Sequence, residues 1–266
     1  MFQINLFTTY YNEENNFRKQ ELLSCMQKNI LNKTISKITI FNEGESLAYL
    51  APTKIKEVFI EKRPTYRDFI NYINANSNPD DINIIANTDI FFDKNLEVLK
   101  YINLNNTCLA LSRWDTTDTI RPKLYNLNDS QDAWVFKGFI KQCLKADFPL
   151  GVPRCDNRLL FELLEAGYKV LNPAFSIKVF HVHKRHPAFV YTEDDNNYNI
   201  KPPFRYLFPH NLFGFFKTLF FNLKQKEQLG VYHYDIKKLN NWWVVRFPRK
   251  LIEILTNKKL PLIGYK

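Results

Sequence analysis

The run Ile84-Ile85-Ala86-Asn87-Thr88-Asp89-Ile90-Phe91-Phe92-Asp93 decides the fold class of this chain. It opens with an apolar segment of strand type and stops abruptly at a polar triplet, Asn87-Thr88-Asp89. In an open α/β sheet, ligands bind outside the carboxyl ends of the strands, so a buried strand that ends in a carboxylate can present it to a ligand. The oxygens of Asp89 suit a divalent cation that carries phosphates. The stretch therefore predicts an α/β fold with a ligand site at the edge of its sheet.

Strand and helix patterns alternate around this run, which predicts a mainly parallel mixed sheet flanked by helices. Strands are expected at residues 3–11, 36–41, 56–62, 83–89, 107–112, 133–137, 168–171 and 177–183. Helices are expected at 13–29 after the cap Asn12, after the caps Thr65 and Asp93, and from Asp156 to Gly167. A polar stretch at 193–197 marks a boundary, so we expect one domain over residues 1–192 and a helical extension over residues 193–266.

The composition is that of a globular protein, with 45% hydrophobic, 15% aromatic and 24% charged residues. The sequence has no apolar run of 18 residues, which argues against a transmembrane helix, and its start does not look like a signal peptide. The four cysteines lack C-x-x-C spacing, which argues against zinc and thioredoxin-like sites. Reduced, mostly buried thiols fit a cytoplasmic protein.

The net charge of +10 comes entirely from the C-terminal quarter of the chain. Residues 1–195 hold 24 basic and 24 acidic residues, whereas residues 196–266 hold 13 basic and 3 acidic residues. This asymmetry suggests that the C-terminal segment faces an anionic partner, and both a membrane surface and nucleic acid fit by sign.

Helical spacing of apolar residues favours the membrane over nucleic acid. After Asn211, apolar residues recur at 212, 215, 216, 219, 220 and 223, with lysines off this stripe and Trp242-Trp243 followed by further cations. Such a helix can lie in a membrane interface and be attracted by anionic lipids. The alternative is that the stripe packs on the preceding domain. No nucleic-acid-binding module is recognisable, so nucleic acid is not expected as a partner.

Histidines supply a second candidate ligand set. His181 and His183 lie two residues apart in an expected strand, so both imidazoles point to the same side. Asn87 and Asp89 share one side of the extended chain in the same way. Neutral imidazole suits manganese and zinc-like ions more than magnesium. The alternative is a solvated basic strand end, because Lys184-Arg185 follows directly.

Three further groups are candidates for binding or proton transfer. Asp156 stands where a helix begins, so the helix dipole would keep it ionised and available as a base, although Asp is also an ordinary helix cap. The stretch Ser130-Gln131-Asp132-Ala133-Trp134 joins a carboxylate to an aromatic ring, as sugar sites do, and Arg113-Trp114-Asp115 repeats this chemistry. The alternative for either Trp is an anchor in the core.

In their order along the chain, these motifs resemble those of GT-A-fold nucleotide-sugar glycosyltransferases, of the family 2-like type that builds bacterial surface polysaccharides. The resemblance rests on a D-x-D-like strand end (Asn87-Thr88-Asp89), a helix-opening acid (Asp156), a late His strand (His181, His183) and the opening Tyr11-Asn12-Glu13. It covers roughly residues 2–190. The first D-x-D position is Asn87, which leaves one carboxylate in that motif.

The resemblance implies a role for each matching residue. Asp89, completed by His181 or His183, would bind Mn²⁺ or Mg²⁺, and this metal would hold the donor diphosphate. The nucleotide would be lined by Thr9, Tyr10, Arg63, Arg67, Asn87 and Thr88. The sugar and the acceptor would contact Arg113, Trp114, Asp132, Trp134 and Asn157. Asp156 would deprotonate the acceptor hydroxyl in an inverting displacement, with a retaining outcome still open.

We therefore expect a metal-dependent glycosyltransferase that moves a sugar from a nucleotide sugar to a saccharide or lipid-linked glycan. The expected location is the cytoplasm, with peripheral contact to an anionic membrane. Two other classes stay open. A nucleotidyltransferase would use a similar sheet, although the Gly-rich phosphate loop expected after its first strand is missing. A non-catalytic, membrane-associated protein that binds nucleotides or glycans would fit the altered D-x-D triplet.

Overall fold

The computed structural model describes residues 2–117, 120–182, 200–212, 243–258 and 260. Its centre is a seven-stranded sheet in the order β10-β6-β9-β4-β1-β2-β3, and all neighbours are parallel except β9, which runs antiparallel to β4 and to β6. The strands are β1 (Ile4–Tyr10), β2 (Lys37–Asn42), β3 (Ile55–Phe59), β4 (Ile82–Ala86), β6 (Thr107–Leu111), β9 (Ala133–Lys137) and β10 (Lys169–Leu171). The predicted mainly parallel α/β sheet is confirmed.

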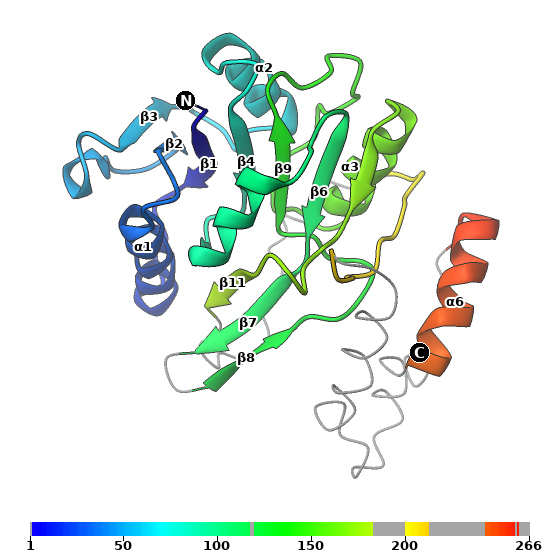
Figure 1. Cartoon of the computed structure of the whole chain (residues 1–266). Helices are drawn as coiled ribbons and strands as arrows, with labels where there is room; N and C mark the ends of the chain where they lie inside the picture. Colours follow the sequence, from blue (N-terminus) through cyan, green and yellow to red (C-terminus); the bar gives the residue numbers. More distant parts are fainter. Residues whose placement is uncertain (1, 118–119, 183–199, 213–242, 259, 261–266) are drawn as a thin grey trace.

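Helices cover both faces of this sheet (Figure 1). They are α1 (Asn16–Leu31), α2 (Tyr66–Asn76) and α3 (Cys155–Glu165), with 3-10 helices η1 (Ala48–Leu50) and η2 (Lys94–Tyr101). Successive strand residues divide between two cores. Ile84 packs in a cluster with residues of α1 and η2, whereas Ile85 packs in a cluster with residues of α2 and α3. This burial on both faces explains why β4 is a continuous apolar run rather than an alternating one.

A second sheet of four strands, not predicted as such, extends from the first. Its order is β5-β11-β7-β8, with the strands β5 (Ile90–Phe92), β7 (Arg113–Thr117), β8 (Ile120–Leu124) and β11 (Val179–Val182). Three residues separate the end of β4 from the start of β5, so the predicted strand at 83–89 is too long at its carboxyl end. Asn87, Thr88 and Asp89 instead form the turn between the two sheets.

Two of the predicted helix starts are one turn or less from the observed ones. Asn15, not Asn12, caps α1, because its side chain accepts hydrogen bonds from the backbone of Phe17 and Arg18. Arg154, with a left-handed φ of 69°, precedes α3, so Asp156 lies in the first turn rather than at the cap. The cap Thr65 is confirmed, with Asp68 completing a capping box. Asp93 caps η2 as predicted.

One more helix is described near the C-terminus. It is α6 (Trp243–Thr256), which lies beside the body of the protein, with residues 200–212 between it and α3 (Figure 1). The predicted boundary between residues 192 and 193 and most of the predicted amphipathic helix after Asn211 fall outside the described residues. No helix in the described part of the chain is long and apolar enough to cross a membrane.

Candidate active site

The reversed direction of β9 brings polar residues from three strands to one edge of the main sheet. Ala86 at the end of β4 is paired with Ala133 at the start of β9, and Leu111 at the end of β6 pairs with the same residue. Asp132 therefore lies at the carboxyl ends of β4 and β6, and its carbonyl accepts a hydrogen bond from the backbone of Asn87 (3.2 Å). Gly151 has a φ of +79°, which suits glycine, and a Cβ at this position would lie 3.8 Å from Oδ1 of Asn87.

The second sheet carries the histidine to the same edge. β11 lies between β5 and β7, and the register places His181 opposite Asp115 on one side and Ile90 on the other. Because Ile90 directly follows Asp89, this register brings the imidazole to the predicted metal corner. His183, the second predicted histidine ligand, lies outside the described residues.

Asp89, His181 and Asp115 form a connected polar triad. The Nε2 atom of His181 lies 3.3 Å from Oδ2 of Asp89, and its Nδ1 atom lies 2.9 Å from Oδ1 of Asp115. Burial on its own would lower the pKa of His181, but the two carboxylates raise it to about 9. The pKa of Asp115 is lowered despite its partial burial, because His181 and Arg113 stabilise its charge.

Arg18 of α1 completes the surroundings of Asp89. Its guanidinium contacts Oδ2 of Asp89 at 2.5 Å and also Oε2 of Glu21 at 3.2 Å. Although burial would raise the pKa of Asp89, the charges of His181 and Arg18 hold it well below its usual range. Asp89 is therefore ionised throughout the physiological pH range.

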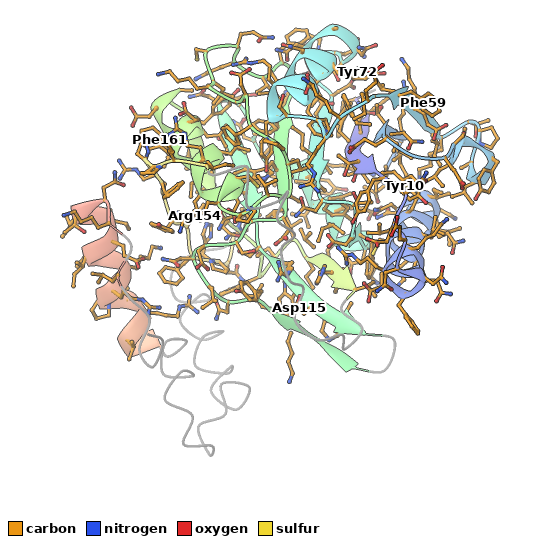
Figure 2. All side chains as sticks on the ribbon, turned by 180° about the vertical axis from the view of Figure 1, so that it is seen from behind. Tyr10, Phe59, Tyr72, Asp115, Arg154 and Phe161 are labelled. Carbon is orange, nitrogen blue, oxygen red and sulfur yellow. The ribbon has the colours of Figure 1, made fainter. Side chains whose placement is uncertain are left out.

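Arg113 links this triad to the middle of the sheet edge. Its Nε atom lies 3.0 Å from Oδ1 of Asp115, and its Nη1 atom lies 3.2 Å from Oδ1 of Asp132. The side-chain amide of Asn87 also donates to Oδ1 of Asp132 (3.3 Å). Polar contacts thus run without a break from Asp89 to Asp132. Figure 2 labels Asp115 at the second sheet, below the main sheet.

Asp156 lies beyond the Asp132 end of this row and is linked to it through Gln131, the residue before Asp132. Its carboxylate accepts hydrogen bonds from the backbone of Asn157 (2.8 Å) and of Gln131 (3.2 Å). Burial raises the pKa of Asp156 to about 7, and the nearby charge of Asp132 acts in the same direction. A carboxylate with such a pKa can both accept and release a proton near neutral pH, as a general base must.

The donor atoms at Asp89 fit a divalent cation in part. A separation of 3.3 Å would let the Asp89 oxygen and the His181 nitrogen act as neighbouring ligands of one ion. The ion would have to displace the proton that this imidazole holds while its pKa is about 9. The hydrogen bond from Nδ1 to Asp115 is the support that metal-binding histidines usually have. Among the described residues, no three His, Cys, Asp or Glu side chains converge on one point, so a metal here would take its other ligands from substrate phosphates and water.

Tyr11, rather than the predicted Tyr10, lies near Asp89. Tyr10 is the last residue of β1 and is only 2% exposed, packed in the core. Tyr11 is half-buried, and the charges of Arg18 and Asp89 both act on its pKa, which burial raises. Tyr11 replaces Tyr10 in this role because successive residues of an extended chain point to opposite faces.

Both tryptophans predicted to contact sugar lie in the interior. Trp134 is 0% exposed and packs edge-on against Tyr66, with 6.4 Å between ring centroids. Trp114 is buried too, and its indole N–H donates to the carbonyl of Ala174 (2.8 Å). Because β9 is covered on both faces, its aromatic residue faces protein, which corrects the prediction of sugar stacking.

The remaining predicted residues are placed around the edge of the sheet. Arg67 anchors the loop at 142–147 through the carbonyl groups of Gln142 and Leu144 and an ion pair with Asp147, so its guanidinium has a structural role. Arg63 lines a cleft of about 540 Å³ with Lys62 and Thr65. Asn157 is buried and donates to the carbonyl of Arg205 (3.2 Å), so it holds the segment 200–212 against α3.

Thr9 and Thr88 join the two predicted phosphate-side segments to each other. The hydroxyl of Thr88 donates to the carbonyl of Thr9 (2.9 Å). Because its hydrogen is used there, the Thr88 oxygen accepts a hydrogen bond from the hydroxyl of Thr9 (2.6 Å). We expect the near-isosteric variant Thr88→Val to lower the free energy of unfolding by about 1–3 kcal/mol, because the carbonyl of the half-buried Thr9 loses the hydroxyl that donates to it. Urea unfolding measures the change, with the exposed Thr53→Val as the matched control. Unchanged stability together with weaker nucleotide binding would instead assign the hydroxyl to a ligand.

Asp115 appears in the predicted group Arg113-Trp114-Asp115 but not as a partner of His181, and Arg18 is not predicted as a site residue. Their partners lie 66 and 71 residues away in sequence, so no local motif marks them. The only local signal is in Arg113-Trp114-Asp115, where two charged residues alternate with an apolar one, as on a half-buried strand.

Comparison with known proteins gives structural neighbours only. The sequence matches no family model and no curated protein. Similar solved structures include the mannosyltransferase PcManGT from Pyrobaculum calidifontis with GDP-Man and Mn²⁺ (12% identity, 68% of this chain, 56% of that chain, TM-score 0.44). GalNAc-T7 with UDP, GalNAc and Mn²⁺ is also similar (9% identity, 74% of this chain, 47% of that chain, TM-score 0.45).

A putative glucose-1-phosphate thymidylyltransferase from Bacillus anthracis is similar as well (7% identity, 68% of this chain, 87% of that chain, TM-score 0.37). The aligned part of each of the first two proteins is about half of its length. The neighbours thus include two glycosyltransferases and one nucleotidyltransferase. At these identities and TM-scores, the similarity identifies neither a reaction nor a substrate for this chain.

Proposed function

We propose that the chain is a metal-dependent glycosyltransferase that moves a sugar from a nucleotide sugar to a saccharide or lipid-linked glycan. One observation carries this proposal. A row of polar contacts begins at a carboxylate–imidazole pair suited to a metal and ends at Asp132, and Gln131, the neighbour of Asp132, donates its backbone N–H to Asp156, whose pKa is about 7. A group transfer from a diphosphate to a hydroxyl needs both functions, at separate places within one site.

The Asp89 end supplies what the leaving group requires. Asp89 and His181 would hold Mn²⁺ or Mg²⁺, and the ion would neutralise the charge that develops on the departing diphosphate. Asp115 fixes the orientation of the imidazole, and Arg18 keeps the carboxylate ionised while adding a positive charge beside it. Asn87 and Thr88 position this turn through their hydrogen bonds to Asp132 and Thr9.

The Asp156 end supplies what the acceptor requires. In the proposed reaction its carboxylate takes the proton of the attacking hydroxyl, and attack from the side opposite the diphosphate inverts the anomeric centre. Burial supports this role, because an aspartate with an ordinary pKa near 3.8 would be a weak base. Arg113 and Asp132 lie between the two ends, where polar groups can bind sugar hydroxyls.

A screen of nucleotide sugars, with and without Mn²⁺, tests the proposal. We expect metal-dependent release of a nucleoside diphosphate from at least one donor. Release of pyrophosphate from a nucleoside triphosphate and a sugar phosphate would identify a nucleotidyltransferase instead. Calorimetry that detects no binding of nucleoside diphosphates, even with Mn²⁺, would leave only a non-catalytic function.

The outer face of α6 supports peripheral contact with an anionic membrane at the cytoplasmic face. Phe247, Leu251, Ile254 and Leu255 follow helical spacing and are 47%, 50%, 53% and 76% exposed. The segment that contains them has 13 basic and 3 acidic residues. An exposed apolar stripe in a strongly basic segment fits the interface of a bilayer with anionic lipids better than it fits water.

We expect the double variant Leu251→Glu/Leu255→Glu to bind phosphatidylglycerol vesicles about tenfold more weakly or worse, because the carboxylates oppose both burial and charge attraction. Co-sedimentation with vesicles measures the binding. Leu31→Glu is the matched control, because Leu31 is 78% exposed on α1, away from α6. Equal binding by the wild type, the double variant and the control would show that α6 does not contact the membrane.

A further inference from the structure

The inner face of α6 is charged, which is unusual for a helix packed on a protein. Arg246, Arg249 and Glu253 are 4%, 8% and 4% exposed, while the apolar residues from Phe247 to Leu255 are exposed. Glu253 is engaged by Asn128 and by the backbone N–H of Leu260 (3.0 Å). The helix therefore turns its cations, rather than its apolar side chains, toward the body of the protein.

Arg246 is buried and pairs with no carboxylate among the residues that the structure describes. Its Nε and Nη1 atoms have no hydrogen-bond acceptor, although both are inaccessible to solvent. Its contacts include the face of the Phe208 ring, with Cζ 4.4 Å from the ring centroid. Lys250 stacks on the same ring at 5.1 Å. Arg246 is subject to repulsion from Arg249, and burial and this repulsion lower its pKa to about 9.

A buried cation with unsatisfied N–H groups costs several kcal/mol unless an anion pairs with it. Stacking on Phe208 repays only a part of this cost. The fork of a guanidinium matches the oxygens of a phosphate group, and a lysine one turn away adds a second positive charge. Two cations on one ring, of which one is a buried guanidinium, therefore suit a phosphate group.

The contacts of residues 205–208 place this site near Asp156 rather than near Asp89. The side chain of Gln131 donates to the carbonyl of Leu207 (3.3 Å), while its backbone N–H donates to Asp156 (3.2 Å). Phe208, which carries the two cations, is the next residue. Arg154, which directly precedes α3, lies on the side of the body that faces α6 (Figure 2).

We infer that Arg246 and Lys250, stacked on Phe208, bind a phosphate group of the acceptor. That the phosphate belongs to an acceptor rests on the proposed function. The binding of a phosphate group at Arg246 and Lys250 does not. The group is a phosphomonoester or phosphodiester, carried either by a soluble glycan or by a lipid headgroup. Binding would pair the buried guanidinium and would hold the acceptor hydroxyl on the Asp156 side of the site.

Thermal unfolding of the full chain in EDTA tests the site without the metal. In phosphate-free buffer, we expect Arg246→Met to unfold at the same temperature as the wild type or higher, because an unpaired buried charge is removed. Addition of glycerol phosphate, at ionic strength matched with NaCl, should raise the Tm of the wild type by about 2 °C or more. This rise should disappear in Arg246→Met and persist in Lys258→Gln, whose lysine is exposed at the same terminus.

The inference is overturned if Arg246→Met keeps the phosphate-dependent rise, or if it unfolds at a lower temperature without phosphate. A larger rise with glucuronate than with glycerol phosphate would also overturn it, in favour of a carboxylate. Vesicles distinguish the two sources of phosphate. Weaker binding of Arg246→Met to phosphatidylglycerol vesicles, with binding to phosphatidylcholine vesicles unchanged, supports a lipid headgroup. Unchanged vesicle binding, with the rise from soluble phosphate lost, supports a soluble acceptor.

Asp89→Ala separates this inference from the proposed function. The variant should lose metal-dependent nucleotide binding but keep the phosphate-dependent rise in Tm, because Asp89 lies at the opposite end of the polar row. If no donor is ever turned over and the rise still depends on Arg246, the phosphate site stands and the transferase proposal fails. If transfer occurs and phosphate does not raise the Tm, the transferase proposal stands and the phosphate site fails.

Discussion

Replacement of Asp89 by alanine should lower glycosyl transfer by about 10³-fold or more and abolish metal-dependent nucleotide binding. Asp89 is the one carboxylate of the turn after β4, and no second acid in that turn can replace it as a ligand. Loss of metal stabilisation of the leaving diphosphate by about 4 kcal/mol corresponds to this factor. Initial rates at saturating Mn²⁺ and calorimetry with the nucleoside diphosphate measure the two effects.

The control for this variant must separate chemistry from folding. Removal of Asp89 leaves Arg18 and His181 beside each other without their shared carboxylate, which destabilises the fold. Asp89→Asn keeps the shape and some hydrogen bonding, so it should be inactive while more stable than Asp89→Ala. Asp93→Asn, four residues on, keeps a capping side chain for η2 and should be fully active. Full activity of Asp89→Ala would show that this corner takes no part in the reaction.

Replacement of Asp156 by asparagine should lower kcat by about 10²–10⁴-fold, the usual contribution of a general base. The pH profile of the wild type gives a second test. Because only the ionised carboxylate accepts a proton, activity should rise with pH and level off above about pH 7, where the pKa of Asp156 lies. The residual activity of Asp156→Asn should lack this rise. A wild-type profile that is flat from pH 5 to pH 8 would rule out Asp156 as the base.

The same variant should be more stable than the wild type above neutral pH. The folded pKa of Asp156 is raised from 3.8 to about 7, so folding favours its protonated form. The resulting cost is absent below about pH 4, grows between pH 4 and pH 7, and is complete above pH 7. Because the residue is only half-buried, we expect a gain on the order of 1–3 kcal/mol for Asp156→Asn at pH 8 and little change at pH 4. Urea unfolding at the two pH values measures the difference.

Local sequence signals were sufficient for the main sheet. The apolar run of β4 and the boundaries of β9 follow directly from residue patterns, and the capping box at Thr65 has a recognisable sequence. In the second sheet, β11 lies within the predicted strand at 177–183, whereas β5, β7 and β8 are not predicted as strands. β5 is only three residues long and joins β4 through one turn. A single extended pattern cannot reveal that a chain leaves one sheet and enters another.

The pairing of Asp89 with a histidine could be predicted, because both side chains are typical ligands of the same metal ions. A carboxylate after a buried strand and a histidine in a late strand do meet, at 3.3 Å. The positions of Arg18 and Asp115 depend on the packing of α1 and the register of β11, which are set by tertiary contacts rather than by local sequence. Trp134 is predicted to contact sugar because aromatic rings commonly pack on sugar rings. Its strand is covered on both faces, so the side chain packs in the core instead.

The reversed arrangement of α6 changes how this helix should respond to its surroundings. A helix held through an apolar face is released with a large increase in heat capacity and is little affected by salt. The described contacts of α6 are the hydrogen bonds of Glu253 and the stacking of Arg246 and Lys250 on Phe208, with Arg246 repelled by Arg249. Added salt screens this repulsion, so it should hold α6 more firmly on the body. The position of the C-terminal segment would thereby depend on the ions and anionic lipids around the protein.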